Sequence, residues 1–157
     1  MTPSLFVRNA LDPALMLLPQ TMDTKPARAM MVAIALQESR IQHRKQINGP
    51  ARGYWQFEMG GGIAGVLSHP ASRPHIQRVC EELDYDPHAG DCYNAVAHND
   101  ILACCFARLL LYTLPQLLPV RSDPDGGWDQ YIAAWRPGRP HRDTWNNFFQ
   151  MGWLLTE

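Results

Sequence analysis

The sequence has few charged residues and almost no net charge. Asp, Glu, Lys and Arg make up 18% of the 157 residues, and the formal net charge is −1. Nucleic-acid binding relies on a strongly basic surface, so this balance gives no support for a nucleic-acid partner. Hydrophobic residues make up 46%, which argues against a disordered chain and predicts one compact domain over residues 1–157.

A long hydrophobic run is also missing. The most apolar stretch, Ile101–Tyr112, is about half the length that spans a bilayer, and it contains Arg108. It is predicted to lie in the core rather than in a membrane. Residues 1–20 are interrupted by Pro3 and Pro13 and make a poor signal-peptide core. We therefore expect neither a membrane span nor a signal peptide.

The sequence lacks the residue spacing of a metal site. No two cysteines form a CxxC pair, and no two histidines are four residues apart, as on one face of a helix. A zinc amidase is therefore not favoured, and no metal or cofactor is expected. Cys80 and Cys92 flank a predicted loop, and the sequence leaves open whether they form a disulfide. The cysteines are Cys80, Cys92, Cys104 and Cys105, and the histidines are His43, His69, His75, His88, His98 and His141.

An apolar helix is the clearest local structure in the sequence. Residues 29–36, AMMVAIAL, contain no polar side chain, and Pro26 suits the first turn of a helix. This pattern predicts a helix over Pro26–Ser39 that is buried on nearly every face. Further helices are predicted over Pro74–Leu83, Asp91–Leu114 and Trp128–Trp135, and from Asp143 onward, with turns or prolines between them.

Asn48–Gly65 differs in composition from the rest of the chain. It holds six of the 11 glycines, Pro50 and the aromatic pair Tyr54 and Trp55. Glycines allow tight turns and a close approach of the backbone, so the stretch predicts a loop or a short β-hairpin. Tyr54 and Trp55 either belong to the core or offer flat faces that stack on sugar rings. The expected fold class is mainly α (α+β), with five or six helices around a buried central helix and this small hairpin or glycine-rich loop.

Glu38 is the first candidate for chemistry, because it stands at the end of the apolar helix. A carboxylate that loses water in such a position has a raised pKa and keeps a proton near neutrality. A general acid that protonates a glycosidic oxygen needs this property. The alternative is that Glu38 is the first exposed residue after the buried run and pairs with Arg40 or Arg44.

Three motifs together resemble the lysozyme-like lytic transglycosylases. Glu38-Ser39 is followed, 18 positions after the glutamate, by the glutamine of Gly53-Tyr54-Trp55-Gln56. These two pieces are similar to the family's Glu-Ser and Gly-Leu-Met-Gln signatures. Residues 132–138, IAAWRPG, are similar to the helix end that lies across the cleft from the acid in that family. The three windows follow the family's order and fit its intervals.

The resemblance implies a lysozyme-like fold and a cleft that binds the glycan strands of peptidoglycan. In the family, one glutamate acts as acid and then as base. It cuts between N-acetylmuramic acid and N-acetylglucosamine and leaves a 1,6-anhydro end. Carried over to this chain, Glu38 would be the catalytic acid/base, and the substrate-binding residues would be Ser39, Tyr54, Trp55, Gln56, Tyr131, Trp135 and Arg136.

Two features leave alternatives to this function. The family's Tyr-Asn pair corresponds here to Trp135 and Arg136, and a cation beside Glu38 would favour its ionised form and oppose the raised pKa. A peptidoglycan-binding or virion structural module without turnover is therefore one alternative. Glu58 is a candidate second carboxylate that could position water, which would make the protein a lysozyme-type hydrolase.

The second motif, in the form GPARGYWQFE, is similar to that of phage or prophage lysins. This resemblance implies a phage-encoded lysin, held in the virion or the host cytoplasm before release and acting in the periplasm or cell wall. Phage virion or secretion-machine proteins are the expected partners besides peptidoglycan. An aromatic stripe in the last predicted helix would either close the core or dock on such a partner. It comprises Trp145, Phe148, Phe149 and Trp153.

Overall fold

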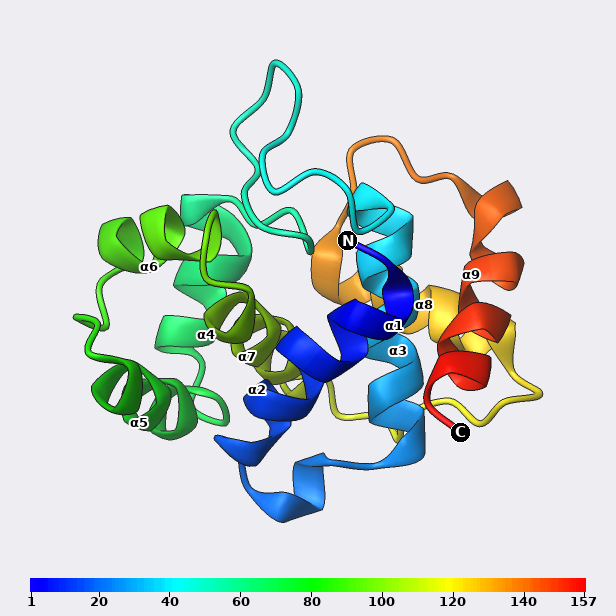
Figure 1. The fold of residues 1–157 in the computed structure, drawn as a ribbon, viewed down its shortest axis with the longest axis horizontal. Coiled ribbons are helices and arrows are strands. Elements are labelled where there is room, and N and C mark those ends of the chain that lie inside the picture. The colour runs from blue at the N-terminus through cyan, green and yellow to red at the C-terminus, as the bar shows by residue number, and fades with distance from the viewer.

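The computed structural model describes all 157 residues, is 64% helical and contains no β-strand. The mainly α fold class is therefore confirmed (Figure 1). The elements in chain order are α1 (Pro3–Phe6), η1 (Val7–Leu11), α2 (Asp12–Met16), η2 (Gln20–Met22), α3 (Lys25–Ser39), η3 (Met59–Ile63), α4 (Ala64–Ser68), α5 (Arg73–Leu83), α6 (Ala89–Val96), α7 (Asp100–Tyr112), α8 (Pro124–Trp135) and α9 (Arg142–Leu155).

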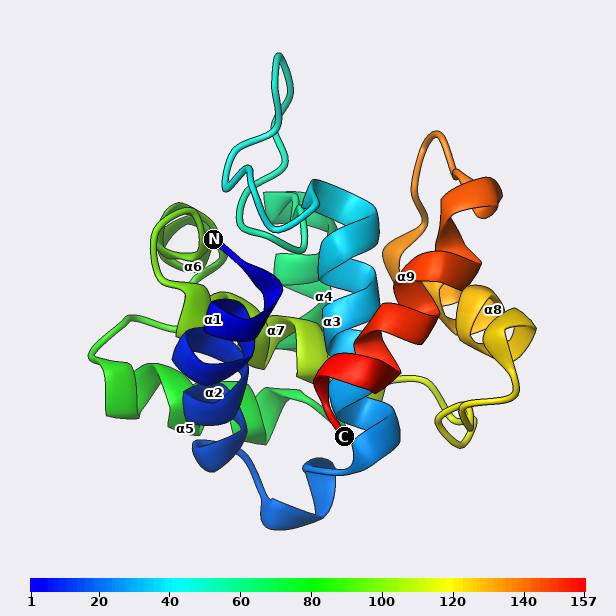
Figure 2. The ribbon, with the colours of Figure 1, turned by 45° about the vertical axis from the view of Figure 1, so that its right-hand side comes forward.

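α3 is the central element of the fold. Thr24 caps its N-terminus, where the side-chain oxygen accepts a hydrogen bond from Ala27 N (3.2 Å). Residues 29–36 are all buried, because α7 and the N-terminal segments cover one side of α3 and α9 covers another (Figures 1 and 2). The helix ends at Ser39, and Arg40 takes the left-handed conformation (φ 57°). The predicted buried helix is confirmed.

α9 packs along α3 with its aromatic stripe turned inward. Trp145 and Phe149 are fully buried, and Trp145 stacks on Tyr131 of α8, with 5.3 Å between ring centroids and 7° between ring planes. Gly152 lies where α9 comes closest to α3, since a Cβ at this position would be 2.3 Å from Ala29 O. The stripe therefore closes the core between α3, α8 and α9.

The prediction of one continuous helix over Asp91–Leu114 is wrong. The region forms two helices, α6 and α7, and the chain bends by 118° between them. The break falls at residues 97–99, where Asn99 caps α7 by accepting a hydrogen bond from Leu102 N (3.0 Å). The bend places α6 against η3 while α7 runs through the core. No single helix is long and apolar enough to cross a membrane, and α6 and α7 meet that requirement only when taken together across the bend.

Short helical segments also occur where the sequence predicted none. Residues 3–16 form α1, η1 and α2, and the two α-helices hold Pro3 and Pro13 in their first turns. These prolines interrupt the apolar run of the sequence, but proline fits the first turn of a helix. α8 begins at Pro124, before its predicted start, because the Asp123 side chain caps it. The chain therefore has more helices than the five or six expected.

The predicted β-hairpin does not form. Residues 40–58 make only two isolated antiparallel bridges, Lys45 with Arg52 and Arg52 with Phe57. Their loop projects beyond the end of α3, as the cyan-to-teal segment of Figure 1 shows. Gly53 makes a tight turn in the left-handed region (φ 77°). The remainder of the glycine-rich stretch is largely helical, in η3 and the start of α4.

All four cysteines are buried free thiols. Cys80 of α5 and Cys92 of α6 lie side by side, with 3.9 Å between their sulfur atoms. Cys104 and Cys105 are part of α7 and lie in the hydrophobic core. The sequence left open whether Cys80 and Cys92 form a disulfide, and in the structure their thiols are in contact without one.

Replacing Gly152 by alanine should destabilise the protein, because the new methyl group would meet Ala29 O at the α3–α9 contact. We expect the free energy of unfolding to fall by about 1–3 kcal/mol, as for other overpacked sites. Gly65→Ala is the matched control, since Gly65 lies in α4 with no atom within 4 Å of the Cβ position. Urea unfolding followed by circular dichroism measures both, and equal stability of the two variants would contradict the close helix contact.

Candidate active site

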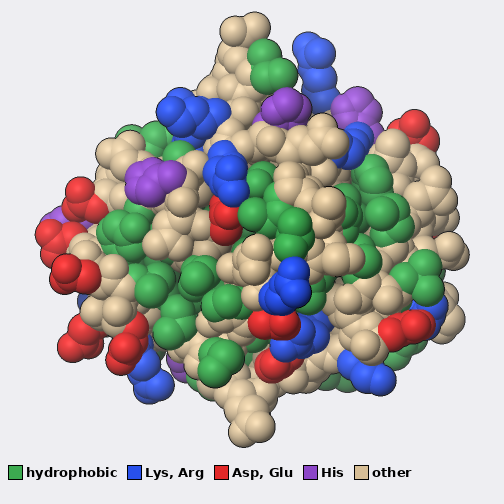
Figure 3. Space-filling model, in the orientation of Figure 1, with side chains coloured by type: hydrophobic (Ala, Val, Ile, Leu, Met, Phe, Trp, Pro, Cys, Tyr) green, Lys and Arg blue, Asp and Glu red, His purple; other side chains and the backbone are tan.

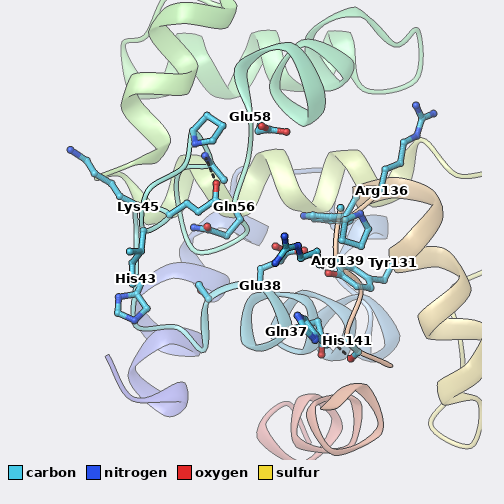
Figure 4. A pocket seen from close by; sticks show the side chains of 18 residues that line it. Gln37, Glu38, His43, Lys45, Gln56, Glu58, Tyr131, Arg136, Arg139 and His141 are labelled. Carbon is cyan, nitrogen blue, oxygen red and sulfur yellow. Dashed lines mark hydrogen bonds between the residues drawn. The ribbon is translucent and has the colours of Figure 1, made fainter. Parts of the chain in front are cut away.

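A polar cavity of about 680 Å³ opens where the end of α3 faces the C-terminal end of α8. Its walls are α3, the loop of residues 40–58, α8 and the loop of residues 136–141. Glu38 lies between these walls (Figure 4). Only four of the 18 lining residues are hydrophobic, so the cavity suits a hydrophilic ligand.

Glu38 has an unusually high pKa for a carboxyl group. Its removal from water raises the pKa to about 7. Two weaker effects act in the opposite direction, because a hydrogen bond from Tyr131 and the charge of Arg40 both favour the ionised form. Desolvation dominates, and the carboxyl group is therefore about half protonated at neutral pH.

Tyr131 of α8 holds the Glu38 carboxyl group in place. Its hydroxyl donates a hydrogen bond to Glu38 Oε1 (2.5 Å). The ring is buried and stacked on Trp145, so it has little freedom to turn. Burial is the chief cause that raises the pKa of the Tyr131 phenol, and the Glu38 charge adds to it. The phenol therefore stays protonated and remains a donor.

The turn after Glu38 has an uncommon backbone conformation. Arg40 and Ile41 both have a φ of 57°, which is rare for non-glycine residues and rarest for a β-branched one. The Ser39 hydroxyl secures this turn, because it donates to Tyr54 O (2.7 Å) and accepts from Ile41 N (3.2 Å). These contacts fix the end of α3 and with it the direction of the Glu38 side chain.

Arg40 is close to Glu38 in sequence, but it binds the backbone. Its Nη1 atom donates to two carbonyl oxygens in the last turn of α3, both at 2.7 Å, and its guanidinium lies 4.6 Å from the Phe148 ring centroid. Arg44 forms an ion pair with Asp100 (2.8 Å). The pairing of Glu38 with Arg40 or Arg44, which the sequence left open, therefore does not occur.

Gln56 and Trp135, two of the predicted substrate-binding residues, line the cavity. The Gln56 amide nitrogen donates to Gly53 O (2.8 Å), and the amide oxygen has no partner within the chain. Trp135 Nε1 donates to Trp55 O (3.0 Å), and its ring stacks on Phe57 with centroids 6.0 Å apart. Trp135 thus joins the end of α8 to the loop that carries Gln56.

Tyr54 and Trp55, predicted to stack on sugar rings, lie in the core with exposed fractions of 1% and 0%. Tyr54 packs edge-to-face on Phe6, and the Trp55 indole donates to Met31 O (3.0 Å). Burial of these large rings is favourable, and the Trp55 indole N–H finds a partner inside. Ser39 lines the cavity, but main-chain groups hold its hydroxyl. The predicted contacts of Tyr54 and Trp55 with substrate are therefore corrected, whereas Ser39 lies on the cavity wall beside Glu38.

Arg136 lines the cavity as the left-handed residue (φ 49°) that ends α8. Its side chain extends away from Glu38 in Figure 4, and its charge is not among the causes of the shifted Glu38 pKa. The condition under which Arg136 would oppose the raised pKa, a guanidinium beside Glu38, is therefore not met. Glu58 is exposed and lines the cavity on a different wall from Glu38 (Figure 4).

Several polar residues of the cavity were not predicted from the motifs. Gln37 donates to His141 O (2.9 Å) and accepts from Thr144 Oγ1 (3.0 Å), which ties the end of α3 to the start of α9. The basic stretch that follows α3, HRK, was a visible clue to His43 and Lys45, but it lies outside the three motifs. The missed lining residues with ionisable side chains are His43, Lys45, Arg139 and His141.

The geometry of the cavity supports proton transfer. Glu38 can give up a proton near pH 7 and take one back once it is ionised. No three lining residues could share one metal ion; the one such group in the chain, Asp86, His88 and Asp91, is exposed around the start of α6. No family model, curated protein or solved structure matches this chain.

Glu38→Gln should stabilise the protein in a pH-dependent way. The folded-state pKa of Glu38 is about 7, above the ordinary value of 4.5. Wild type therefore loses stability as the pH rises from 4.5 to about 7, because only the unfolded chain then ionises this group freely. Glutamine keeps an acceptor for Tyr131 without this loss. We expect the variant to be more stable than wild type by roughly 3 kcal/mol at pH 8 and nearly equal at pH 4. Thermal unfolding measures the difference, and one that is the same at both pH values would contradict the raised pKa.

Proposed function

We propose that the protein is a lysozyme-like lytic transglycosylase that cleaves the glycan strands of peptidoglycan, with Glu38 as its single acid/base. The observation that carries this proposal is the desolvated Glu38 carboxyl group, with a pKa of about 7, in a polar cavity. The resemblance of the motifs supports it, because Glu38, Gln56 and Trp135 come from the three separate motifs and line the same cavity.

In the proposed reaction, Glu38 gives its proton to the glycosidic oxygen as the bond from that oxygen to the anomeric carbon of N-acetylmuramic acid breaks. The resulting carboxylate is stabilised by the hydrogen bond from Tyr131. It then accepts the proton of the muramoyl 6-hydroxyl while that oxygen bonds to the anomeric carbon. Glu38 ends protonated as it began, the product is a 1,6-anhydro end, and no water is consumed.

The same proposal extends to origin, place of action and partners. The form of the second motif favours a phage-encoded lysin that acts on the cell wall, with virion or secretion-machine proteins as further partners. In the aromatic stripe of α9, Trp145 and Phe149 are buried in the core, and Phe148 and Trp153 are half-buried against it, so the core takes up most of the stripe. Peptidoglycan is thus the partner for which the cavity itself provides an argument.

A lysozyme-type hydrolase is the second candidate function, favoured by the position of Glu58. Its exposed carboxylate lines a different wall of the cavity from Glu38, where it could position a water molecule for attack on the anomeric carbon. The products decide between the two reactions, since a hydrolase leaves reducing ends and a transglycosylase leaves anhydro ends.

Loss of the acid should abolish cleavage. We expect Glu38→Gln to lower the rate of turbidity loss of purified cell walls by about 10²–10⁴-fold, because the amide cannot donate a proton as an acid does. Glu82→Gln, at an exposed position of α5 outside the cavity, is the matched control and should keep wild-type activity. Equal activity of wild type and Glu38→Gln would remove Glu38 from the mechanism.

Muropeptides released by wild type should carry anhydro ends, and Glu58→Gln should release the same products. Mass spectrometry distinguishes anhydro from reducing ends by the mass of one water. Reducing ends in wild type that disappear in Glu58→Gln would establish the hydrolase instead.

Tyr131→Phe should move the pH dependence of the reaction. The phenol lowers the Glu38 pKa, so its removal raises that pKa, and the fall of kcat/KM at high pH shifts upward by about one pH unit. The phenyl ring keeps the packing against Trp145. A pH profile with an unchanged alkaline limb would show that the hydrogen bond to Glu38 does not control its proton.

A further inference from the structure

The cavity is lined by more basic than acidic side chains. Lys45, Arg136 and Arg139 line it together with two histidines, whereas its only carboxylates are Glu38 and Glu58. None of the three cations forms an ion pair, although other arginines of the chain do. None makes a side-chain hydrogen bond within the chain either. Their charges are therefore available to a ligand.

These cations occupy two separate walls. Lys45 comes from the loop that follows α3, and Arg136 and Arg139 come from the loop that follows α8. In Figure 4, Lys45 and Arg136 lie on opposite sides of Glu38. Lys, Arg and His side chains gather at the end of the molecule where these loops project (Figure 3). The chain as a whole has a net charge of −1, so the basic character is local to this end.

The distribution of charge indicates where a ligand would carry its anionic groups. Glu38 and Glu58 would repel an anionic backbone that runs through the middle of the cavity. Exposed cations on both sides would attract anionic groups that branch from a neutral backbone. Guanidinium groups are well suited to carboxylates, because they can donate two parallel hydrogen bonds.

We propose that Lys45, Arg136 and Arg139 bind carboxylates on the peptide stems of the glycan strand, so that the protein selects strands with acidic stems over neutral or stem-free ones. This inference rests on the proposed function, because it places a glycan strand in the cavity. The sugar backbone lies at Glu38, and the stems extend toward the two basic loops. Lys45, Arg136 and Arg139 are specificity-determining residues in this arrangement.

Binding is measured by pelleting in the Glu38→Gln background, so that no strand is cut during the assay. The probes are sacculi free of phosphate polymers, the same sacculi with their stem carboxylates converted to amides, and strands from which an amidase has removed the stems. The test variant carries Lys45→Gln, Arg136→Gln and Arg139→Gln. The control variant carries Arg8→Gln, Arg73→Gln and Arg78→Gln, which remove the same charge from exposed positions outside the cavity.

The parent should bind acidic sacculi about tenfold more tightly than amidated sacculi or stem-free strands, as expected for several screened ion pairs. The test variant should lose this preference, and the control variant should keep it. Added salt should weaken the preference of the parent.

Equal affinity of the parent for all three probes would overturn the inference and leave the proposed function standing. Equal loss of preference in the test and control variants would overturn it too, because long-range charge alone would then explain the effect. If the parent binds none of the probes, the proposed function falls together with the inference.

Discussion

The removal of Glu38 from water at the end of α3 is the constraint on which the rest of the site depends. A carboxylate in this position is unstable, and its pKa rises to about 7. The surroundings supply one direct donor, the Tyr131 hydroxyl, and no ion pair. A fully paired Glu38 would hold no proton at neutral pH, so the absence of a cation in contact with it matters as much as the hydrogen bond.

Contacts outside the cavity hold Glu38 and Tyr131 in position. α9 packs so closely on α3 that Gly152 has no room for a side chain, and the Trp145 ring on α9 stacks on Tyr131. On the other side, Ser39 binds the backbone of Tyr54, and Trp135 binds the backbone of Trp55. The buried aromatic residues therefore position the phenol and the walls of the cavity, and the carboxyl group faces a preorganised site.

Features that depend on a local sequence pattern could be predicted from the sequence. The unbroken apolar run defined α3, and the position of Glu38 at its end predicted the raised pKa that the structure shows. The motifs predicted that Gln56 and Trp135 would line the cavity.

Tyr54 and Trp55 were wrong as substrate-binding residues, because composition alone cannot tell an aromatic residue that faces a cavity from one that faces the core. The bend at Asn99 was missed because the apolar pattern continues on both sides of it. The hydrogen bond between Tyr131 and Glu38 joins residues 93 positions apart, so no local sequence pattern could predict it.

The central claim is that Glu38 keeps its proton near neutral pH, and carbon NMR of the side-chain carboxyl groups tests it most directly. The Glu38 signal is assigned as the one missing in Glu38→Gln. It should titrate with a midpoint of about 7, and this midpoint should move to a higher pH in Tyr131→Phe. A midpoint near the ordinary value of 4.5 would show that the carboxyl group is ionised at neutral pH and would contradict the proposal that Glu38 is a proton donor.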